Sequence, residues 1–265
     1  MKTNAALRSI PIRRRGPIDA ALLPAPGEIA QCGTACSTCN LRELCVPCCG
    51  LTRSEQDAAG RLGFNRSRVR RGASLYRSGD RFTSLYGVRS GFFKTLALLE
   101  DGRDQVTGFS MPGELLGMEA IGPERHSCNA IALEDSEVCV IPFAGLQALA
   151  QAIPGLQRHF RRTMGREIVR EHGVMLQLGS MKAEERLAML LLDLSQRFAA
   201  HGYSRSDFNL RMTREEMGSY LGLTLETVSR AFSKFQEEGV IAVRQKFIRI
   251  LDSARLRQVM GRNVD

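Results

Sequence analysis

The chain has 265 residues, 43% of them hydrophobic and 25% charged, a composition that excludes a disordered or fibrous protein and suits two modest domains. Its 37 Lys and Arg outnumber 28 Asp and Glu, and the net charge of +9 favours an anionic partner such as a phosphate backbone. Because no apolar run reaches the length of about 18 residues that a membrane span needs, and none suits a signal peptide, we expect a cytoplasmic protein with no membrane partner.

Cysteine is concentrated near the N-terminus. Residues 1–31 predict a flexible extension, to which we assign no function. Residues 32–50 form a cysteine-rich loop with Cys32, Cys36, Cys39, Cys45, Cys48 and Cys49. Thiols stay reduced in the cytoplasm, so metal binding explains this loop better than disulfide bonds. A short helix is expected next, from Ser54 to about Leu62.

Residues 51–153 are predicted to form a β-rich domain. From about Phe64 to Phe143, short apolar segments are broken by turns roughly every 8 to 12 residues, which is typical of an antiparallel sandwich or roll. The turns are expected at Gly72, Ser78-Gly79-Asp80, Arg89-Ser90-Gly91, Glu100-Asp101-Gly102 and Met111-Pro112-Gly113.

A long helix is predicted over residues 154–180. Its apolar residues recur in steps of mostly three and four, which makes a narrow stripe like a coiled-coil seam. The stripe contains Leu156, Phe160, Met164, Ile168, Met175 and Leu178. Glu171 interrupts this stripe, and a tilted helix that lets its carboxylate reach water is one explanation.

The C-terminal part, residues 181–265, predicts a helix-turn-helix with a wing. A first helix over Lys182–His201 begins the core of this part. Thr213 and Glu216 match a capping box, and Thr224 can cap a second helix after a turn at Leu221-Gly222-Leu223. A β-hairpin is expected from Val240 to Leu251.

The second helix of this motif has the residues that read DNA bases. Leu225, Val228, Phe232 and Phe235 are expected to face inward, which leaves Glu226, Ser229 and Arg230 outward. Arg can bond guanine with two donors, Glu can accept from cytosine and Ser can contact a base or a phosphate. An ion pair between Glu226 and Arg230 on the surface is the alternative explanation. The neighbouring wing and the positive charge of the chain favour DNA.

The run from Met212 to Gln236, MTREEMGSYLGLTLETVSRAFSKFQ, resembles the helix-turn-helix of the FNR (fumarate and nitrate reduction regulator) group in the CRP/FNR superfamily. The resemblance continues through residues 113–117 (GELLG), residues 141–143 (IPF) and the long helix. It therefore covers nearly everything after residue 31.

The resemblance implies an α+β fold: an N-terminal double-stranded β-helix, which is a β-roll like that of cyclic-nucleotide-binding domains, then a dimerisation helix and a winged helix-turn-helix. The implied protein is a homodimer that binds palindromic double-stranded DNA, with half-sites of the type TTGAT. The implied DNA-binding residues are Thr213, Glu226, Ser229 and Arg230. The implied dimer seam is Phe160, Met164, Ile168, Glu171, Met175 and Leu178. Asp101, Gly102 and Arg103 match a loop that contacts RNA polymerase in relatives.

The cysteines match the FNR group's pattern of cluster ligands. Cys36-x2-Cys39-x5-Cys45 resembles its ligand spacing, and Cys139 matches its distant fourth ligand. Four thiolates are the usual ligand set of a [4Fe-4S] cluster, although a zinc site of four thiolates uses the same ligands. Cys32, Cys48 and Cys49 leave the ligand choice open, while Cys128 is expected to be a packed small hydrophobe. The resemblance implies an oxygen sensor that controls anaerobic genes.

Two other classes of function fit the sequence less well. A CRP-like regulator would hold a cyclic nucleotide with an Arg-Ser pair, whereas the matching pair here is His126-Ser127, with Arg125 one position away. An enzyme is not expected, since no nucleophile-base pairing, Gly-rich phosphate loop or metal-spaced histidines occur.

Glu171 suggests how dimerisation is controlled. Paired across a two-fold seam at about 6 Å, two such carboxylates repel by roughly 3 kcal/mol at an effective dielectric constant near 20. We expect the intact cluster to offset this repulsion and oxygen to return the protein to monomers, and the resemblance implies the same cycle.

Overall fold

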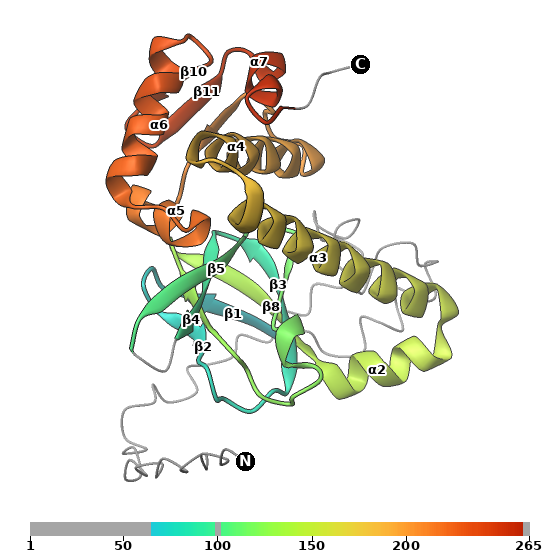
Figure 1. The fold of residues 1–265 in the computed structure, drawn as a ribbon. Helices are drawn as coiled ribbons and strands as arrows, with labels where there is room; N and C mark the ends of the chain where they lie inside the picture. The colour runs from blue at the N-terminus through green and yellow to red at the C-terminus, as the bar shows by residue number, and fades with distance from the viewer. Residues whose placement is uncertain (1–64, 99–101, 262–265) are drawn as a thin grey trace, which may run out of the picture.

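The computed structural model describes residues 65–98 and 102–261. The cysteine-rich loop 32–50, the helix expected over Ser54–Leu62 and Asp101 lie outside the described residues. The described chain forms an antiparallel β-roll, a long helix on its flank and a C-terminal head of helices with a small sheet (Figure 1). The predicted α+β fold is confirmed.

Within the described residues, the β-roll has eight strands in two four-stranded antiparallel sheets, of order β1-β8-β3-β6 and β2-β7-β4-β5. The strands are β1 Asn65–Val69, β2 Ser74–Tyr76, β3 Ser84–Ser90, β4 Phe93–Leu98, β5 Asp104–Ser110, β6 Leu115–Leu116, β7 Asn129–Ala132 and β8 Ser136–Pro142. A short 3₁₀ helix, Met118–Ala120, lies between β6 and β7. The turns expected at Gly72, at residues 78–80 and at residues 111–113 occur between these strands, whereas Arg89 and Ser90 still belong to β3 and the chain bends at Gly91. Of the turn expected at Glu100-Asp101-Gly102, only Gly102 lies within the described residues.

Alternation of side chains explains how the roll encloses a core. Leu85 and Val88 on β3, and Val138 and Ile141 on β8, are all buried, and because each pair is three residues apart its members lie on opposite faces of the sheet. Val88 and Val138 belong to the cluster inside the roll, whereas Leu85 and Ile141 pack with the residues beneath α2. The turn after β3 requires glycine at Gly91, where φ is 88° and a Cβ would collide with the side chain of Ser136.

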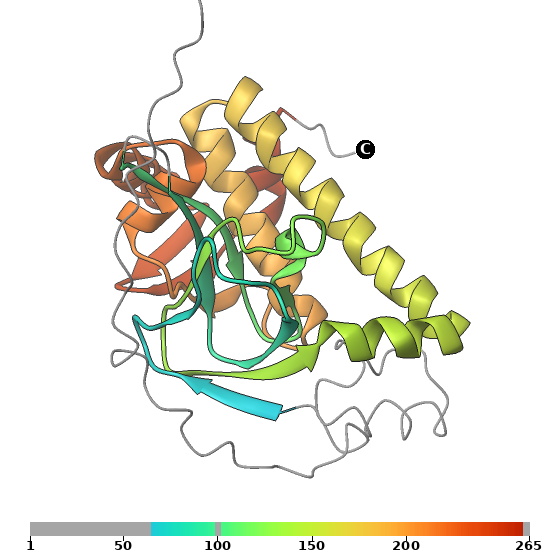
Figure 2. The ribbon, with the colours of Figure 1, turned by 90° about the horizontal axis from the view of Figure 1, so that it is seen from below.

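Three helices lead from the roll to the head. Helix α2 spans Phe143–Ala152, α3 spans Pro154–Ser180 and α4 spans Ala183–Ala200. Pro154 occupies the first turn of α3, where its missing N–H leaves no bond unmade. Figures 1 and 2 show α3 running along one edge of the roll toward the junction with the head. None of the helices in the described ranges is long and apolar enough to cross a membrane.

The head begins with α4 and adds two helices, a three-stranded sheet and a final helix. Its remaining elements are β9 Asp207–Asn209, α5 Arg214–Leu221, α6 Leu225–Glu237, β10 Ile241–Arg244, β11 Phe247–Ile250 and α7 Ser253–Gln258. The sheet order is β10-β11-β9, so the predicted hairpin has a third strand that the sequence analysis missed.

The head does not have a separate core. One hydrophobic cluster joins Phe92, Val106 and Phe109 of the roll to buried residues of α4, α5 and α6, among them Leu191 and Met217. Two further clusters lie inside the roll and beneath α2. The two parts therefore stabilise each other, contrary to the expectation of two independent cores.

Candidate functional site

The turn between α5 and α6 is tight because two glycines shape it. Gly222 ends α5 with φ of 63°, in the left-handed region that glycine adopts most easily. A Cβ at Gly218 would lie 2.6 Å from the carbonyl oxygen of Leu223, closer than real Cβ atoms come. Thr224 then caps α6, since its Oγ1 accepts from the amide of Thr227 at 3.2 Å. The predicted helix-turn-helix is confirmed.

The inner face of α6 packs into the head. Val228, Phe232 and Phe235 are at most 2% exposed. Leu225 was predicted to face inward with them, but it is 46% exposed, so that prediction is wrong. Leu225 is the first residue of α6, and its side chain projects past the end of the core that the later turns cover.

The outer face of α6 presents Glu226, Ser229 and Arg230, of which Glu226 and Arg230 are exposed and Ser229 is half-buried. Arg230 donates to Thr227 Oγ1 at 3.4 Å rather than to Glu226. Hydrogen bonds from its own amide and from the Thr224 hydroxyl lower the pKa of Glu226. An ionised acceptor and a guanidinium with several donors therefore lie on one accessible face, which suits contact with base edges.

Thr213 directly precedes α5 and caps the N-terminus of this helix. Its Oγ1 accepts from the Glu216 amide at 3.1 Å, and Glu216 Oε2 accepts from the Thr213 amide at 2.7 Å, which confirms the capping box. Glu216 Oε1 lies 2.8 Å from Lys94 Nζ on β4. Burial raises the pKa of Glu216, but the bonds from Lys94 and Thr213 outweigh it, and the pKa is lowered. The helix-turn-helix is thus fixed to the roll at this end.

A half-buried ion pair, Glu114–Arg197, joins the roll to α4. Arg197 donates to Glu114 at 2.8 Å from Nε and 2.6 Å from Nη2, and Nη2 also donates to the Phe109 carbonyl at 2.6 Å. Arg170 of α3 lies 4.0 Å from the same carboxylate. Burial raises the pKa of Glu114, but the charge and hydrogen bonds of Arg197 more than reverse this and lower it. The roll, α3 and α4 therefore meet at one carboxylate.

Helix α5 also lies directly on β5. The Val106 amide donates to Ser219 Oγ at 2.8 Å, and the rings of Phe109 and Tyr220 lie 5.2 Å apart. None of these contacts between roll and head was predicted, because the residues are about a hundred positions apart in the chain. In the sequence, the Gly113-Glu114 motif is the one feature that involves these contacts, and it indicated the family rather than a contact between the roll and the head.

The structure divides the predicted dimer seam of α3. Phe160 is half-buried and its ring lies 6.4 Å from that of Phe143, while Leu178 is half-buried beside Gly222. Met164 is also half-buried. Glu171 is exposed, and four apolar side chains near it are more than half exposed. These are Ile168, Val169, Met175 and Leu176, of which Val169 and Leu176 were not predicted.

Cys139 lies on β8, half-buried, between β1 and β3. Its neighbours in register are Arg66 on β1 and Gly87 on β3. Because Val138 is buried in the core, Cys139 points to the outer face of the sheet, and Gly87 contributes no side chain beside it. Arg66 Nε lies 3.6 Å from Glu137 on the same strand. The other proposed ligands, Cys36, Cys39 and Cys45, lie outside the described residues.

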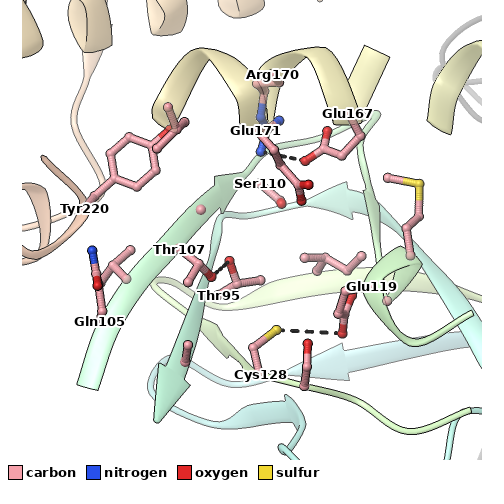
Figure 3. Close-up of a pocket in the computed structure, with 18 of the residues that line it drawn as sticks. Thr95, Gln105, Thr107, Ser110, Glu119, Cys128, Glu167, Arg170, Glu171 and Tyr220 are labelled. Carbon is pink, nitrogen blue, oxygen red and sulfur yellow. Dashed lines mark hydrogen bonds and ion pairs between the residues drawn. The ribbon is translucent and has the colours of Figure 1, made fainter. Parts of the chain in front are cut away.

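The roll and α3 enclose a cavity of about 510 Å³. Figure 3 shows Glu167, Arg170 and Glu171 extending from α3, opposite Glu119 and Cys128 on the roll. Arg170 Nη2 lies 3.1 Å from Glu167, and Cys128 Sγ lies 3.7 Å from Glu119 Oε1. Cys128 is buried, as predicted, although it also has this polar contact.

Of the pair that matches the nucleotide-binding residues of CRP-like proteins, Ser127 lines the cavity, whereas His126 is engaged elsewhere. His126 is 3% exposed, stacks on Tyr76 at 3.7 Å and bonds Glu119 Oε1 through Nδ1 at 2.9 Å. Arg125 is exposed, does not line the cavity, and donates to the Gly79 carbonyl at 2.8 Å. The cavity thus lacks the guanidinium that a cyclic phosphate would require at this position.

Of the loop predicted to contact polymerase, Gly102 and Arg103 are described, and both are exposed. Gly102 has φ of 87°, a backbone conformation that glycine adopts most easily. Asp101 lies outside the described residues.

Comparison with known proteins agrees with this architecture. A cyclic nucleotide-binding domain matches residues 66–152, and a Crp-like helix-turn-helix domain matches residues 185–259. The structure of FixK2 from Bradyrhizobium japonicum has a TM-score of 0.69 at 28% identity, over 75% of this chain and 98% of that one.

Two relatives cover almost the same span. Transcriptional regulatory protein btr of Bordetella pertussis is 47% identical over 226 residues, which is 85% of this chain and 93% of that protein. The fumarate and nitrate reduction regulatory protein of Escherichia coli K12 is 40% identical over 235 residues, 88% of this chain and 94% of that protein. With the roll, long helix and winged helix-turn-helix described above, the chain is a DNA-binding transcription regulator, not an enzyme, and belongs to the CRP/FNR family.

Proposed function

We propose that this regulator is cytoplasmic and responds to oxygen through a [4Fe-4S] cluster held by Cys36, Cys39, Cys45 and Cys139. The observation that carries the proposal is the position of Cys139 on β8, beside Gly87, where its half-buried side chain faces the outside of the roll. Within the described ranges no group of three or more His, Cys, Asp and Glu side chains could hold a metal ion, so a cluster there depends on the cysteine-rich loop.

The donor chemistry at Cys139 fits such a cluster. A thiolate is the ligand that iron-sulfur clusters use, and Arg66, its register neighbour, adds positive charge to the side of the sheet where an anionic group would lie. When bound, the cluster would link the four thiolates to one another, and oxygen would break this link. Cys139 would anchor that link to a rigid central strand of the roll.

The proposal is tested by purifying the full chain without oxygen, measuring iron and sulfide, and recording the visible spectrum before and after air is admitted. About four irons and four sulfides per chain, with a band that bleaches in air, support it. Zinc, or no metal, contradicts it.

For DNA recognition we propose that Arg230 bonds the guanine of a TTGAT half-site and that Glu226 accepts from the paired cytosine. Both side chains lie on the accessible face of α6, and Ser229 lies between them toward the same groove. Thr213 would contact the backbone with the hydroxyl proton that its cap leaves unused.

Arg230→Ala is expected to weaken specific binding by about 1–3 kcal/mol and to relax the preference for guanine. The measurement is a titration against a palindromic site and a variant site that lacks the guanine. Arg244→Ala, in the wing, is the control for lost positive charge and should weaken binding to both sites alike. Equal discrimination by Arg230→Ala and wild type would contradict the assignment.

We further propose that two chains dimerise along α3. The ridge of Ile168, Val169, Met175 and Leu176 is exposed in one protomer, which suits burial against a second copy. Glu171 lies between this ridge and the cavity that it also lines, and it is exposed in a single chain. Pairing of two α3 helices would remove both Glu171 carboxylates from water and bring them together. Because both effects oppose dimerisation, the dimer would need another source of stability.

Glu171→Ala is therefore expected to dimerise in air, because both the repulsion, roughly 3 kcal/mol at an effective dielectric constant near 20, and the desolvation disappear. Sedimentation measured in air checks this. Glu185→Ala, near the start of α4, removes a carboxylate outside the ridge and should remain monomeric. A monomeric Glu171→Ala chain would count against the charge argument.

The segment Asp101, Gly102 and Arg103, of which Gly102 and Arg103 are described and exposed, is proposed as a contact for RNA polymerase, on the match to relatives stated above. Together these parts would let an intact cluster favour a dimer that binds DNA and controls genes used without oxygen.

A further inference from the structure

The outer face of the β1-β8-β3-β6 sheet changes character along β8. Near the end of β8, Ile141 lies opposite Leu85 on β3, and both belong to the buried apolar cluster beneath α2. Two residues earlier, Cys139 lies opposite Gly87. Two residues earlier again is Glu137, which is half-buried. Because alternate residues of a strand share a face, Cys139 lies between an apolar and a charged half of this face.

Arginine side chains surround Glu137 in the charged half. Arg66 on β1 and Arg89 on β3 each place Nε 3.6 Å from Glu137 Oε1. Arg68 is the register neighbour of Glu137 and is exposed, and it points outward because the next residue, Val69, is buried inside the roll. Glu137 is the only acidic residue of β1, β3 and β8. One carboxylate therefore meets three guanidinium groups, and positive charge is left in excess.

This positive charge lies beside Cys139. Arg66 is directly opposite Cys139 in the antiparallel pair of β1 and β8, and such neighbours have Cβ atoms about 5 Å apart. On the other side of Cys139, the opposite residue on β3 is Gly87, which has no side chain. A group bound to Cys139 Sγ would therefore have guanidinium groups on one side and the apolar cluster beneath α2 on the other.

Such surroundings suit an anionic group. A [4Fe-4S] cluster held by four thiolates is an anion, and the charges and hydrogen bonds around a metal centre affect how firmly it is held. Apolar residues on one side lower the local dielectric constant, which strengthens the attraction between that anion and nearby cations. The charged half of the sheet would therefore favour the bound cluster over the free iron-less thiolates.

We propose that Arg66, Arg68 and Arg89, arranged around Glu137, retain the cluster at Cys139 by their positive charge and slow its loss. The arginines do not ligate iron; they act on the group that Cys139 holds. This inference rests on the proposed function, but the positive charge beside Cys139 can be measured without a cluster.

The first measurement uses the iron-free full chain at low salt. Cys139 is alkylated with anionic iodoacetate and, separately, with neutral iodoacetamide, and the two rates are compared by mass spectrometry of the peptide that contains Cys139. The ratio of the rates does not depend on the fraction of thiolate, and positive charge nearby raises it. Arg66→Gln is expected to lower the ratio about threefold. Arg249→Gln, which changes a paired arginine of the head, should leave it unchanged. An equal ratio in wild type and Arg66→Gln, or no reaction at Cys139, overturns the proposal.

The second measurement follows the loss of iron to a chelator from the full chain purified without oxygen. Arg66→Gln is expected to lose iron about tenfold faster than the wild type, whereas Arg66→Lys, which keeps the charge, should stay within about threefold of it. Glu137→Gln removes the negative charge of this face and should slow the loss. A merely structural role of the ion pairs would instead speed the loss in Glu137→Gln.

The outcomes separate this inference from the proposed function. A wild-type chain without a cluster contradicts the proposed function and this inference with it. A cluster in the wild type that Arg66→Gln loses at the same rate, or that Glu137→Gln loses faster, overturns this inference alone. If Arg66→Gln does not fold, Arg89→Gln takes its place with the same expected direction, and an unchanged rate in that variant overturns the proposal.

Discussion

Cys139→Ala protein purified without oxygen is expected to contain little iron and to lose binding to its DNA site. Cys139 is the one proposed ligand that belongs to the roll, on a strand paired on both sides, so its removal leaves at most three thiolates on the cysteine-rich loop. Iron content, sulfide content and a DNA titration on the same sample measure the two effects together.

Cys128→Ala is the matched control. Cys128 is also a cysteine of the roll, but it is buried and points into the cavity, where it contacts Glu119. Its replacement should leave iron content and DNA binding near those of the wild type. Full iron content in Cys139→Ala would remove Cys139 from the ligand set and return attention to Cys32, Cys48 and Cys49.

Arg197→Met is expected to destabilise the chain by about 1–3 kcal/mol, because it leaves the half-buried Glu114 carboxylate without its main partner. Denaturant unfolding followed by circular dichroism measures the loss. Arg211→Met is the control, since Arg211 and Glu134 also join head and roll, at 3.1 Å, but are much more exposed, and its loss should cost below about 1 kcal/mol.

The stability that the Glu114–Arg197 ion pair contributes is expected to fall in acid. The folded-state pKa of Glu114 is lowered from 4.5, so the contribution of its ion pair is fully present above that value and is lost as pH falls through the lower folded pKa. The stability gap between wild type and Arg197→Met should therefore narrow in acid. A gap that stays constant from neutral pH to well below 4.5 would show that the ion pair is not the cause.

Local features of the sequence predicted the helix-turn-helix well. A capping box, a glycine with positive φ and an apolar period of three and four are each specified by residues close together in the chain. The same period failed at Leu225, because periodicity assigns a direction to a side chain but does not show where the core ends. The same periodicity grouped Phe160 and Leu178 with the exposed apolar residues of α3. In the structure, Phe160 lies near Phe143 and Leu178 lies beside Gly222 within the protomer.

Contacts between distant segments could not be predicted in this way. Arg197 lies four residues after Asp193 and bonds it at 3.0 Å, which resembles an ordinary ion pair on a helix surface. Its stronger partner, Glu114, is 83 positions away and becomes its neighbour only when α4 packs on the roll. Likewise, His126-Ser127 indicated a weakened nucleotide site, but Tyr76 and Glu119 become neighbours of His126 only in the folded roll.

Because one hydrophobic cluster extends from the roll into the head, fragments of this regulator are not expected to fold on their own. A fragment beginning at α4 would expose Met217 and Tyr220, which in the intact chain lie against the roll, and such a fragment should aggregate. Grafting the head onto another sensor would require the surface formed by β4 and β5 to be transferred with it. In evolution, exchange of DNA specificity is therefore easier through a few changes on the outer face of α6 than through recombination at the domain boundary.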